Sequence, residues 1–205
     1  MAVKIPAIRI KYAWLLADSA STVMNEKYGD GSPLRSFEEY EEIAAKYREW
    51  WMPHNEKILH GLTDILNLEF RQNIIDVNVA PWFSPISDPL VIGPAFNSED
   101  TLVNTLTHEI IHRLITDNTE IDYEHDFMSD WKKLFGDDHD WNTLIHIPVH
   151  ATMKKLYLDA LNRPDLLELD MEEVKGNKPY SDAWTYVNNH DYRDIVSSLD
   201  ISKHP

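Results

Sequence analysis

Two spacings of apolar residues run along this chain, and each predicts a different secondary structure. In residues 36–51 (SFEEYEEIAAKYREWW) and 55–70 (NEKILHGLTDILNLEF), apolar side chains recur every three to four residues, as in an amphipathic helix. The first run opens with Ser36 and Glu39, the pair of a capping box, and it is interrupted at Pro53. The first third of the chain is therefore predicted to be mostly helical.

The next stretch has the shorter spacing. In residues 72–82 (QNIIDVNVAPW), apolar and polar side chains alternate, with Ile75, Val77 and Val79 on one side, as in a β-strand. PLVIGP at 89–94 is a second short strand candidate, and the prolines of this region exclude a long helix. A small sheet is predicted here, and either strand could offer an edge to an extended peptide.

Helical spacing returns in residues 97–118, where Asn97 or Ser98 is the expected N-cap and Asn118 the expected C-cap. Three further helices are predicted within residues 126–135, 140–161 and 181–199, with a linker-like stretch at 171–181. The fold class that follows is α+β and predominantly helical.

The composition agrees with a packed globular fold. The chain has 205 residues, of which 43% are hydrophobic and 11% aromatic, so it can bury a substantial core. Six of the tryptophans are expected to fill that core: Trp50, Trp51, Trp82, Trp131, Trp141 and Trp184.

Charge narrows the range of partners. With 19 Lys and Arg against 35 Asp and Glu, the formal net charge is −16, which repels phosphate backbones and acidic membranes. Nucleic acid is therefore an unlikely class of partner. Arg9 and Lys11 interrupt the apolar start of the chain, and no apolar run approaches the roughly 20 residues of a membrane helix. The expected location is cytoplasmic, with no membrane association, and the oligomeric state is open.

The strongest chemical signal is HEIIH at residues 108–112. In a helix, His108 and His112 share one face, so both can direct a ring nitrogen at one cation. Glu109 is rotated by about 100° from His108, which suits a carboxylate that takes a proton from water instead of binding the metal. The chain contains no Cys, so any metal must be held by His and carboxylates. The competing interpretation is a coincidence of polar residues on an ordinary helix.

A catalytic zinc ion usually takes three protein ligands, and the sequence offers two sources for the third. One is His125, at the start of the next predicted helix. The other is the pair His146 and His150 in LIHIPVHATMKK, where Pro148 is expected to bend the backbone. His139, in the acidic loop DDHD, is a minor alternative.

HEIIH, the step of 13 residues to His125, and the following Phe127 and Trp131 resemble the SprT-like zinc metalloproteases over residues 98–136. The resemblance implies that His108, His112 and His125 bind Zn²⁺ and that Glu109 is the general base. Together with a length that fits one domain, it predicts a single zincin-like domain over 1–205. That domain would have a helical N-terminal part at about 1–70, a small sheet with the active-site helix at about 72–118, and a C-terminal helical part at about 122–205.

The chain also departs from that family. Asp126 stands where the family usually has Gly after its third His, and no cysteine zinc ribbon or basic DNA-binding tract follows. A role on DNA-crosslinked proteins is therefore not implied. A gluzincin site would need a downstream helical Glu, and Glu168, Glu172 and Glu173 are poorly placed for it.

The predicted function is a zinc metallopeptidase that cleaves peptide or protein substrates. Zinc would polarise the scissile carbonyl, and Glu109 would accept a proton from water and return it to the leaving amine. His146 is an expected metal ligand if His125 is not, and His150 is expected to stabilise the oxyanion of the tetrahedral intermediate. The alternative is a non-catalytic acidic protein that binds metal structurally or serves a partner protein.

Overall fold

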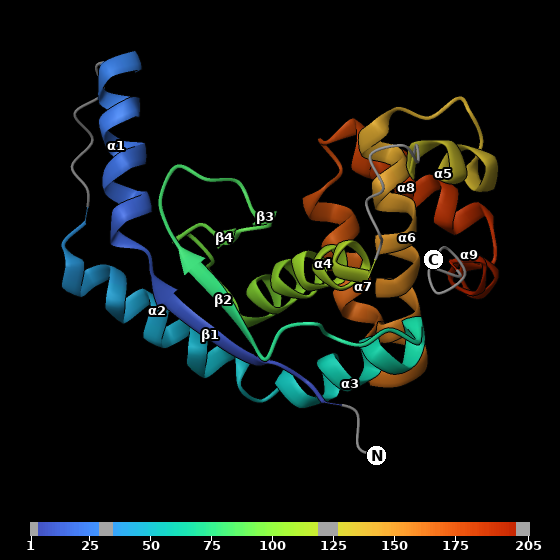
Figure 1. Cartoon of the computed structure of the whole chain (residues 1–205), viewed down its shortest axis with the longest axis horizontal. Coiled ribbons are helices and arrows are strands. Elements are labelled where there is room, and N and C mark those ends of the chain that lie inside the picture. The colour runs from blue at the N-terminus through green and yellow to red at the C-terminus, as the bar shows by residue number, and fades with distance from the viewer. Residues whose placement is uncertain (1–3, 29–34, 119–126, 200–205) are drawn as a thin grey trace. The chain divides into compact units, whose positions relative to one another are not determined.

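The computed structural model describes residues 4–28, 35–118 and 127–199, and it is mostly helical with a small mixed sheet, as predicted (Figure 1). The chain forms two compact units. One consists of Pro6–Asn55 and Gln72–Glu109, and the other of Met1–Ile5, Glu56–Arg71 and Ile110–Pro205. None of the described helices is long and apolar enough to cross a membrane.

The first unit is built on a four-stranded sheet in the order β1-β2-β4-β3. Its strands are β1 (Ala7–Tyr12), β2 (Ile74–Val79), β3 (Ile86–Ser87) and β4 (Leu90–Ile92). β2 runs parallel to both β1 and β4, while β3 is antiparallel to β4. The two predicted strands, β2 and β4, are confirmed, and Ile75, Val77 and Val79 are all buried as their alternation requires.

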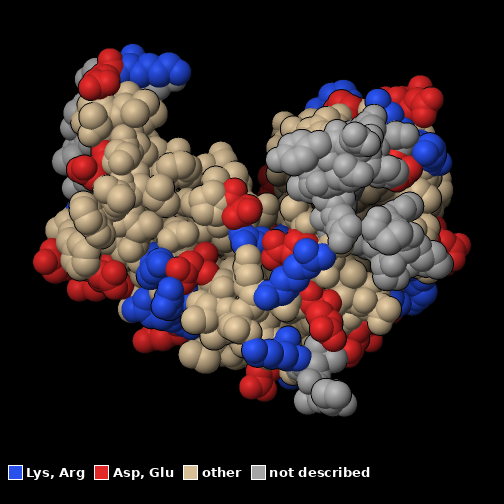
Figure 2. All heavy atoms as spheres, in the orientation of Figure 1, with Lys and Arg blue, Asp and Glu red and all other residues tan. Residues whose placement is uncertain are grey.

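Strand β1 lies in the part of the chain that was expected to be helical. Its charged side chains point to one face, where Arg9 Nε lies 2.5 Å and Lys11 Nζ 2.7 Å from the carboxylate oxygens of Asp76 on β2. Figure 2 shows basic and acidic side chains lying together over these two strands. Cross-strand ion pairs and backbone pairing with a distant strand therefore fix this segment, which local spacing did not reveal.

The sheet order corrects the expectation that β2 or β4 offers a free edge. β2 lies between β1 and β4, and β4 lies between β2 and β3. On β1, an edge strand of the described sheet, Arg48 Nη1 donates a 2.7 Å hydrogen bond to the carbonyl oxygen of Ile10. The Arg48 side chain thus binds a backbone carbonyl with which an added strand would need to pair.

Helices α1 (Trp14–Tyr28) and α2 (Phe37–Trp51) complete the described helices that lie wholly in this unit. The capping box of α2 is present: Ser36 Oγ accepts from the backbone of Glu39, and the Glu39 carboxylate accepts from the backbone of Ser36. α2 packs along β1, where the rings of Tyr12 and Tyr40 stack with their centroids 4.6 Å apart. The predicted helix of residues 36–51 is confirmed.

The second unit is helical. It contains α3 (Asn55–Leu66), α5 (Phe127–Phe135), α6 (Trp141–Lys155), a π-helical segment η1 (Leu156–Leu161), α7 (Pro164–Glu173), α8 (Lys178–Asn189) and α9 (Tyr192–Ser198). α6 is central, since α5, α8 and α9 all pack against it and η1 continues it. The linker-like stretch at 171–181 is instead the end of α7, a short connection and the start of α8.

Helix α4 (Glu99–Asn118) belongs to both units, because the boundary falls between Glu109 and Ile110 within the helix. It begins where predicted, with Ser98 Oγ accepting from the backbone of Thr101. Most of its side chains from Leu102 onward are buried. The buried side chains include polar residues as well as the apolar stripe.

Only part of the tryptophan prediction is correct. Trp51, Trp131 and Trp184 are buried and Trp50 is half-buried, but Trp82 is 43% and Trp141 52% exposed. Trp82 lies in a turn with a positive φ, where its Nε1 donates to Ser21 Oγ, and Trp141 opens helix α6. Both sit at the ends of elements, where a large side chain is not forced into the core.

Candidate metal centre

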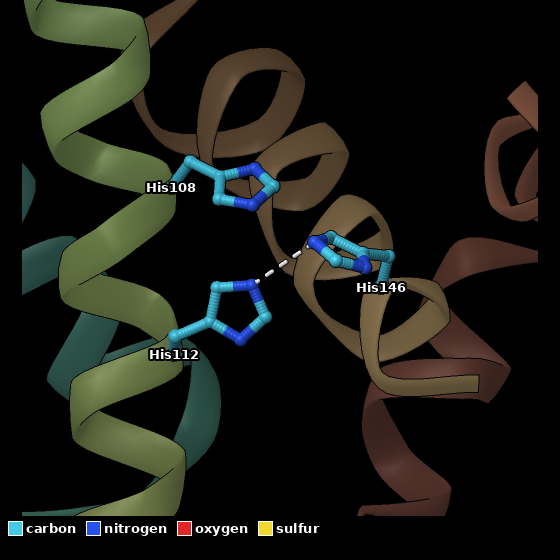
Figure 3. Close-up of side chains that lie close together, drawn as sticks. All are labelled: His108, His112 and His146. Carbon is cyan, nitrogen blue, oxygen red and sulfur yellow. Dashed lines mark hydrogen bonds between the residues drawn. The ribbon is translucent and has the colours of Figure 1, made fainter. Parts of the chain in front are cut away.

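Three histidines converge from two helices. His108 and His112 lie one turn apart on α4, and His146 lies on α6, with its ring directed at the other two (Figure 3). One ring nitrogen from each lies within 4.8 Å of the others, which makes this a group that could hold a metal ion. It is the one group of this kind found among residues 4–28, 35–118 and 127–199. The spacing of the first two follows from the helix, whereas the third position follows from tertiary packing.

Two of the ring nitrogens are already close. His112 Nε2 lies 3.3 Å from His146 Nε2, and the two rings meet edge to face with their centroids 4.9 Å apart. Both residues belong to the second unit, and His108 precedes His112 on the same continuous helix.

The orientation of His146 suits ligation through Nε2. Its Nδ1 lies 2.6 Å from the carbonyl oxygen of Asn142, one turn earlier on α6. A carbonyl can only accept, so Nδ1 carries the proton and Nε2 presents its lone pair toward His112. Metal-binding histidines are commonly held in this way, with the other ring nitrogen donating to a backbone carbonyl.

Burial favours the neutral form of His112 and His146. His108 and His146 are 6% and 3% exposed, while His112 is half-buried. Burial lowers the pKa of His112 to about 3, assisted by the neighbouring His146, and burial also lowers the pKa of His146. A neutral imidazole is the form that binds metal, and three imidazoles suit zinc, copper, iron or nickel.

Glu109 is buried beside this group on α4. It is 6% exposed, and burial raises its pKa to about 7. Glu109 is not one of the three residues that converge, as expected for a carboxylate rotated by about 100° from His108. A bound cation would favour the ionised form of this carboxyl group.

The structure brings together some of the predicted site residues. His108, His112 and His146 form the group, whereas His125 lies outside the described residues. His139 lies instead against the edge of Tyr186, with ring centroids 5.6 Å apart. The role of Glu109 as general base stays a prediction.

His150 is also set apart from the three converging nitrogens. It is fully buried one turn after His146, where its ring stacks on Trp184 at a centroid distance of 4.4 Å. Its expected part in stabilising an oxyanion stays a prediction.

One neighbour of the site could not be singled out in the sequence. The ring of Tyr180, on α8, lies 3.8 Å from that of His146 between centroids, at an interplanar angle of 37°. The sequence alone gives no ground for ranking one tyrosine above another. The only sequence signal is that Tyr180 and Trp184 are one helical turn apart, as are His146 and His150.

Comparison with models of known protein families, with curated proteins and with solved structures found no match to this chain. The resemblance of residues 98–136 to the SprT-like metalloproteases therefore stays a prediction.

Proposed function

We propose that this protein is a zinc-dependent peptidase in which His108, His112 and His146 hold the ion and Glu109 is the general base. The observation that carries the proposal is the convergence of an imidazole from α6 on the two histidines of HEIIH. A pair of His residues on one helix arises easily by chance. A third one, buried and directed at the same point from another helix, makes coincidence a weaker explanation.

One distance in the group is compatible with zinc. Two nitrogen ligands of a tetrahedral zinc ion, each about 2.0–2.1 Å from the metal, lie roughly 3.3–3.4 Å apart. The Nε2 atoms of His112 and His146 are 3.3 Å apart. Three protein ligands also leave a fourth position open, which distinguishes a catalytic zinc site from a structural one with four.

The chemistry assigns separate tasks to the residues. When bound, zinc supplies a Lewis acid that polarises a carbonyl and lowers the pKa of water. Glu109 takes the proton of the attacking water and delivers it to the leaving amine. Its place on α4, buried beside the three histidines but outside the converging group, supports this task.

Replacing Glu109 tests the catalytic part of the proposal. Glu109→Gln is expected to retain bound zinc and to lose hydrolysis of a denatured protein by at least about 100-fold, because general-base catalysis contributes that much or more. The measurements are zinc content of the purified protein and cleavage of the substrate on gels. Glu168→Gln, at an exposed position of α7, is the control. Zinc binding by a parent that cleaves no substrate would instead favour a structural metal site.

The third ligand is tested separately. His146→Ala is expected to lose zinc, whereas His190→Ala, at an exposed position after α8, is expected to keep it. His125→Ala should also keep zinc. If zinc were lost from the His125 variant and kept by the His146 variant, the third ligand would be His125, as the resemblance implies.

A further inference from the structure

Helix α8 presents an aromatic pair to the histidine pair of α6. Tyr180 and Trp184 are one turn apart on α8, and His146 and His150 are one turn apart on α6. The rings pair in order: Tyr180 lies 3.8 Å from His146, and Trp184 stacks on His150 at 4.4 Å with an interplanar angle of only 11°. Each imidazole of the HIPVH segment therefore lies nearest to a different ring of the pair, and Tyr180 also lies 5.9 Å from His150.

The aromatic pair is tied to a third helix by a buried hydrogen bond. Trp184 Nε1 donates to Asp170 Oδ2 of α7 at 2.7 Å, and both residues are at most 5% exposed. An indole can donate only through Nε1, so this bond fixes the rotation of the ring that lies on His150. A buried carboxyl group is costly unless it is hydrogen-bonded, and the bond from Trp184 offsets part of that cost.

We propose that Tyr180 and Trp184 form an aromatic clamp on α6: Tyr180 positions the imidazole of His146 for metal binding, while Trp184, held by Asp170, fixes α8 on α6 through its stack on His150. This inference rests on the proposed metal site. The Asn142 carbonyl holds one edge of the His146 ring, and the Tyr180 ring covers part of one face. A ligand restrained in advance loses less conformational entropy when the ion binds, so the affinity is higher.

A residue of the clamp and an ordinary core residue are distinguished by the quantity that their replacement changes, either metal affinity or the free energy of unfolding. If Tyr180 only fills space, its replacement lowers the free energy of unfolding and leaves the metal affinity of the folded protein unchanged. If its ring positions His146, a flat ring is required at this position. Tyr180→Phe should then behave as the parent, while Tyr180→Leu, which keeps apolar volume without the flat ring, should not.

Metal binding by the folded protein provides the test. Zinc affinity is measured by competition with a coloured chelator, and Co²⁺ is used as a spectroscopic probe of the ligand geometry. Tyr180→Leu and Tyr180→Ala are expected to bind zinc about 10-fold more weakly or worse, a typical cost of losing a group that orients a ligand. Both should also alter the visible Co²⁺ spectrum, and Tyr180→Phe should restore affinity and spectrum.

Tyr186→Ala is the matched control, because Tyr186 is a half-buried tyrosine of the same helix that contacts Phe135 and His190 instead of the metal group. Its zinc affinity should equal that of the parent. Parent-like affinity of Tyr180→Leu, or an equal loss in Tyr186→Ala, would overturn the clamp while leaving the metal site intact. A parent protein that binds no zinc would overturn both.

Asp170 gives an independent arm of the same experiment. Asp170→Asn keeps an oxygen that can accept from Trp184 Nε1 and should bind zinc as the parent does. Asp170→Ala removes the acceptor and should weaken zinc binding. Equal affinities of the Asn and Ala variants would remove Asp170 from the clamp.

Discussion

At the scale of single residues, Asp170 combines two features that rarely occur together. It is a carboxyl group that is 5% exposed, and it accepts a hydrogen bond from an indole rather than from a guanidinium or ammonium group in the contact with Trp184. Burial raises its pKa to about 6, and the hydrogen bond from Trp184 opposes this rise. Asp170 thus favours its protonated form in the folded protein far more than in the unfolded chain.

This difference predicts a pH dependence of stability. Between about pH 4 and pH 6 the unfolded chain has Asp170 ionised while the folded protein retains the proton. The contribution of Asp170 to the free energy of unfolding therefore falls as pH rises through this window, by at most about 3 kcal/mol, and is constant above it. Urea unfolding of the parent and of Asp170→Asn at pH 4, 5, 6 and 7 measures it.

The comparison with Asp170→Asn isolates this group, because the neutral histidines of the same unit contribute with the opposite sign and are present in both proteins. Relative to the parent, the Asn variant should gain stability as pH rises from 4 to 6. A difference between the two proteins that is constant with pH would contradict the prediction.

Tyr180, the tyrosine beside His146, shows which residues of the candidate site could not be predicted from the sequence. His108, Glu109 and His112 were singled out because their separation is set by the helix they share. Tyr180 follows His146 by 34 positions, and its contact with that ring depends on the packing of α8 against α6. Local spacing carries no information about such a contact.

At the scale of elements, α2 is the helix whose beginning is best defined. The side chain of Ser36 accepts from the Glu39 backbone at 3.2 Å, and the Ser36 backbone donates to the Glu39 carboxylate at 2.7 Å. Two backbone donors that a helix leaves without intrahelical partners are satisfied in this way. The helix in turn packs along β1, so its first turn supports the sheet.

Ser36→Ala is therefore expected to lower the free energy of unfolding by about 1 kcal/mol. Chemical denaturation followed by far-UV circular dichroism measures the change. Ser19→Ala, at an exposed position inside α1, is the control and should be neutral or slightly stabilising, since Ala is the better helix former. Equal effects of the two substitutions would show that the cap does not contribute.

Elements with strong local signals were predicted and those without were missed. α2, α3 and α4 have apolar side chains at helical spacing, and α2 and α4 also begin with a Ser cap. β1 owes its conformation to pairing with β2, more than 60 residues later in the chain, as the register Ala7 to Ile74 shows. The predicted helix at 181–199 is two helices, because His190 is extended and Asp191 caps α9.

At the scale of the whole molecule, charge and metal binding have separate consequences. The net charge of −16 is spread over a surface on which, in the view of Figure 2, Lys and Arg side chains lie in small groups among Asp and Glu. Such a surface gives no extended basic area on that face for a polyanion. The histidine group is buried, so its effect on the protein is expected in stability rather than in surface charge.

Zinc is expected to stabilise the folded chain. A ligand that binds only the folded state raises the free energy of unfolding by about 2.7 kcal/mol at 100 times its Kd. Thermal unfolding should therefore show a Tm that rises with zinc concentration and returns to the starting value with a chelator. Mg²⁺, which prefers oxygen ligands, should have little effect.

His146→Ala is the control for this measurement. Its Tm should not respond to zinc over the range that shifts the parent. A parent Tm that is independent of zinc, or a His146 variant that responds equally, would contradict binding of zinc at the three histidines.

The sequence by itself determined the features that depend on neighbours in the chain. These are the predominance of helix, the N-caps of α2 and α4, strands β2 and β4, and the pairing of His108 with His112. These depend on interactions within one or two turns, which spacing encodes directly. The tertiary structure alone decided that His146 joins that pair, that Tyr180 and Trp184 lie on the α6 histidines, and that β1 is a strand. Each of these is a contact between segments far apart in the chain, and it exists only once the helices and strands have packed.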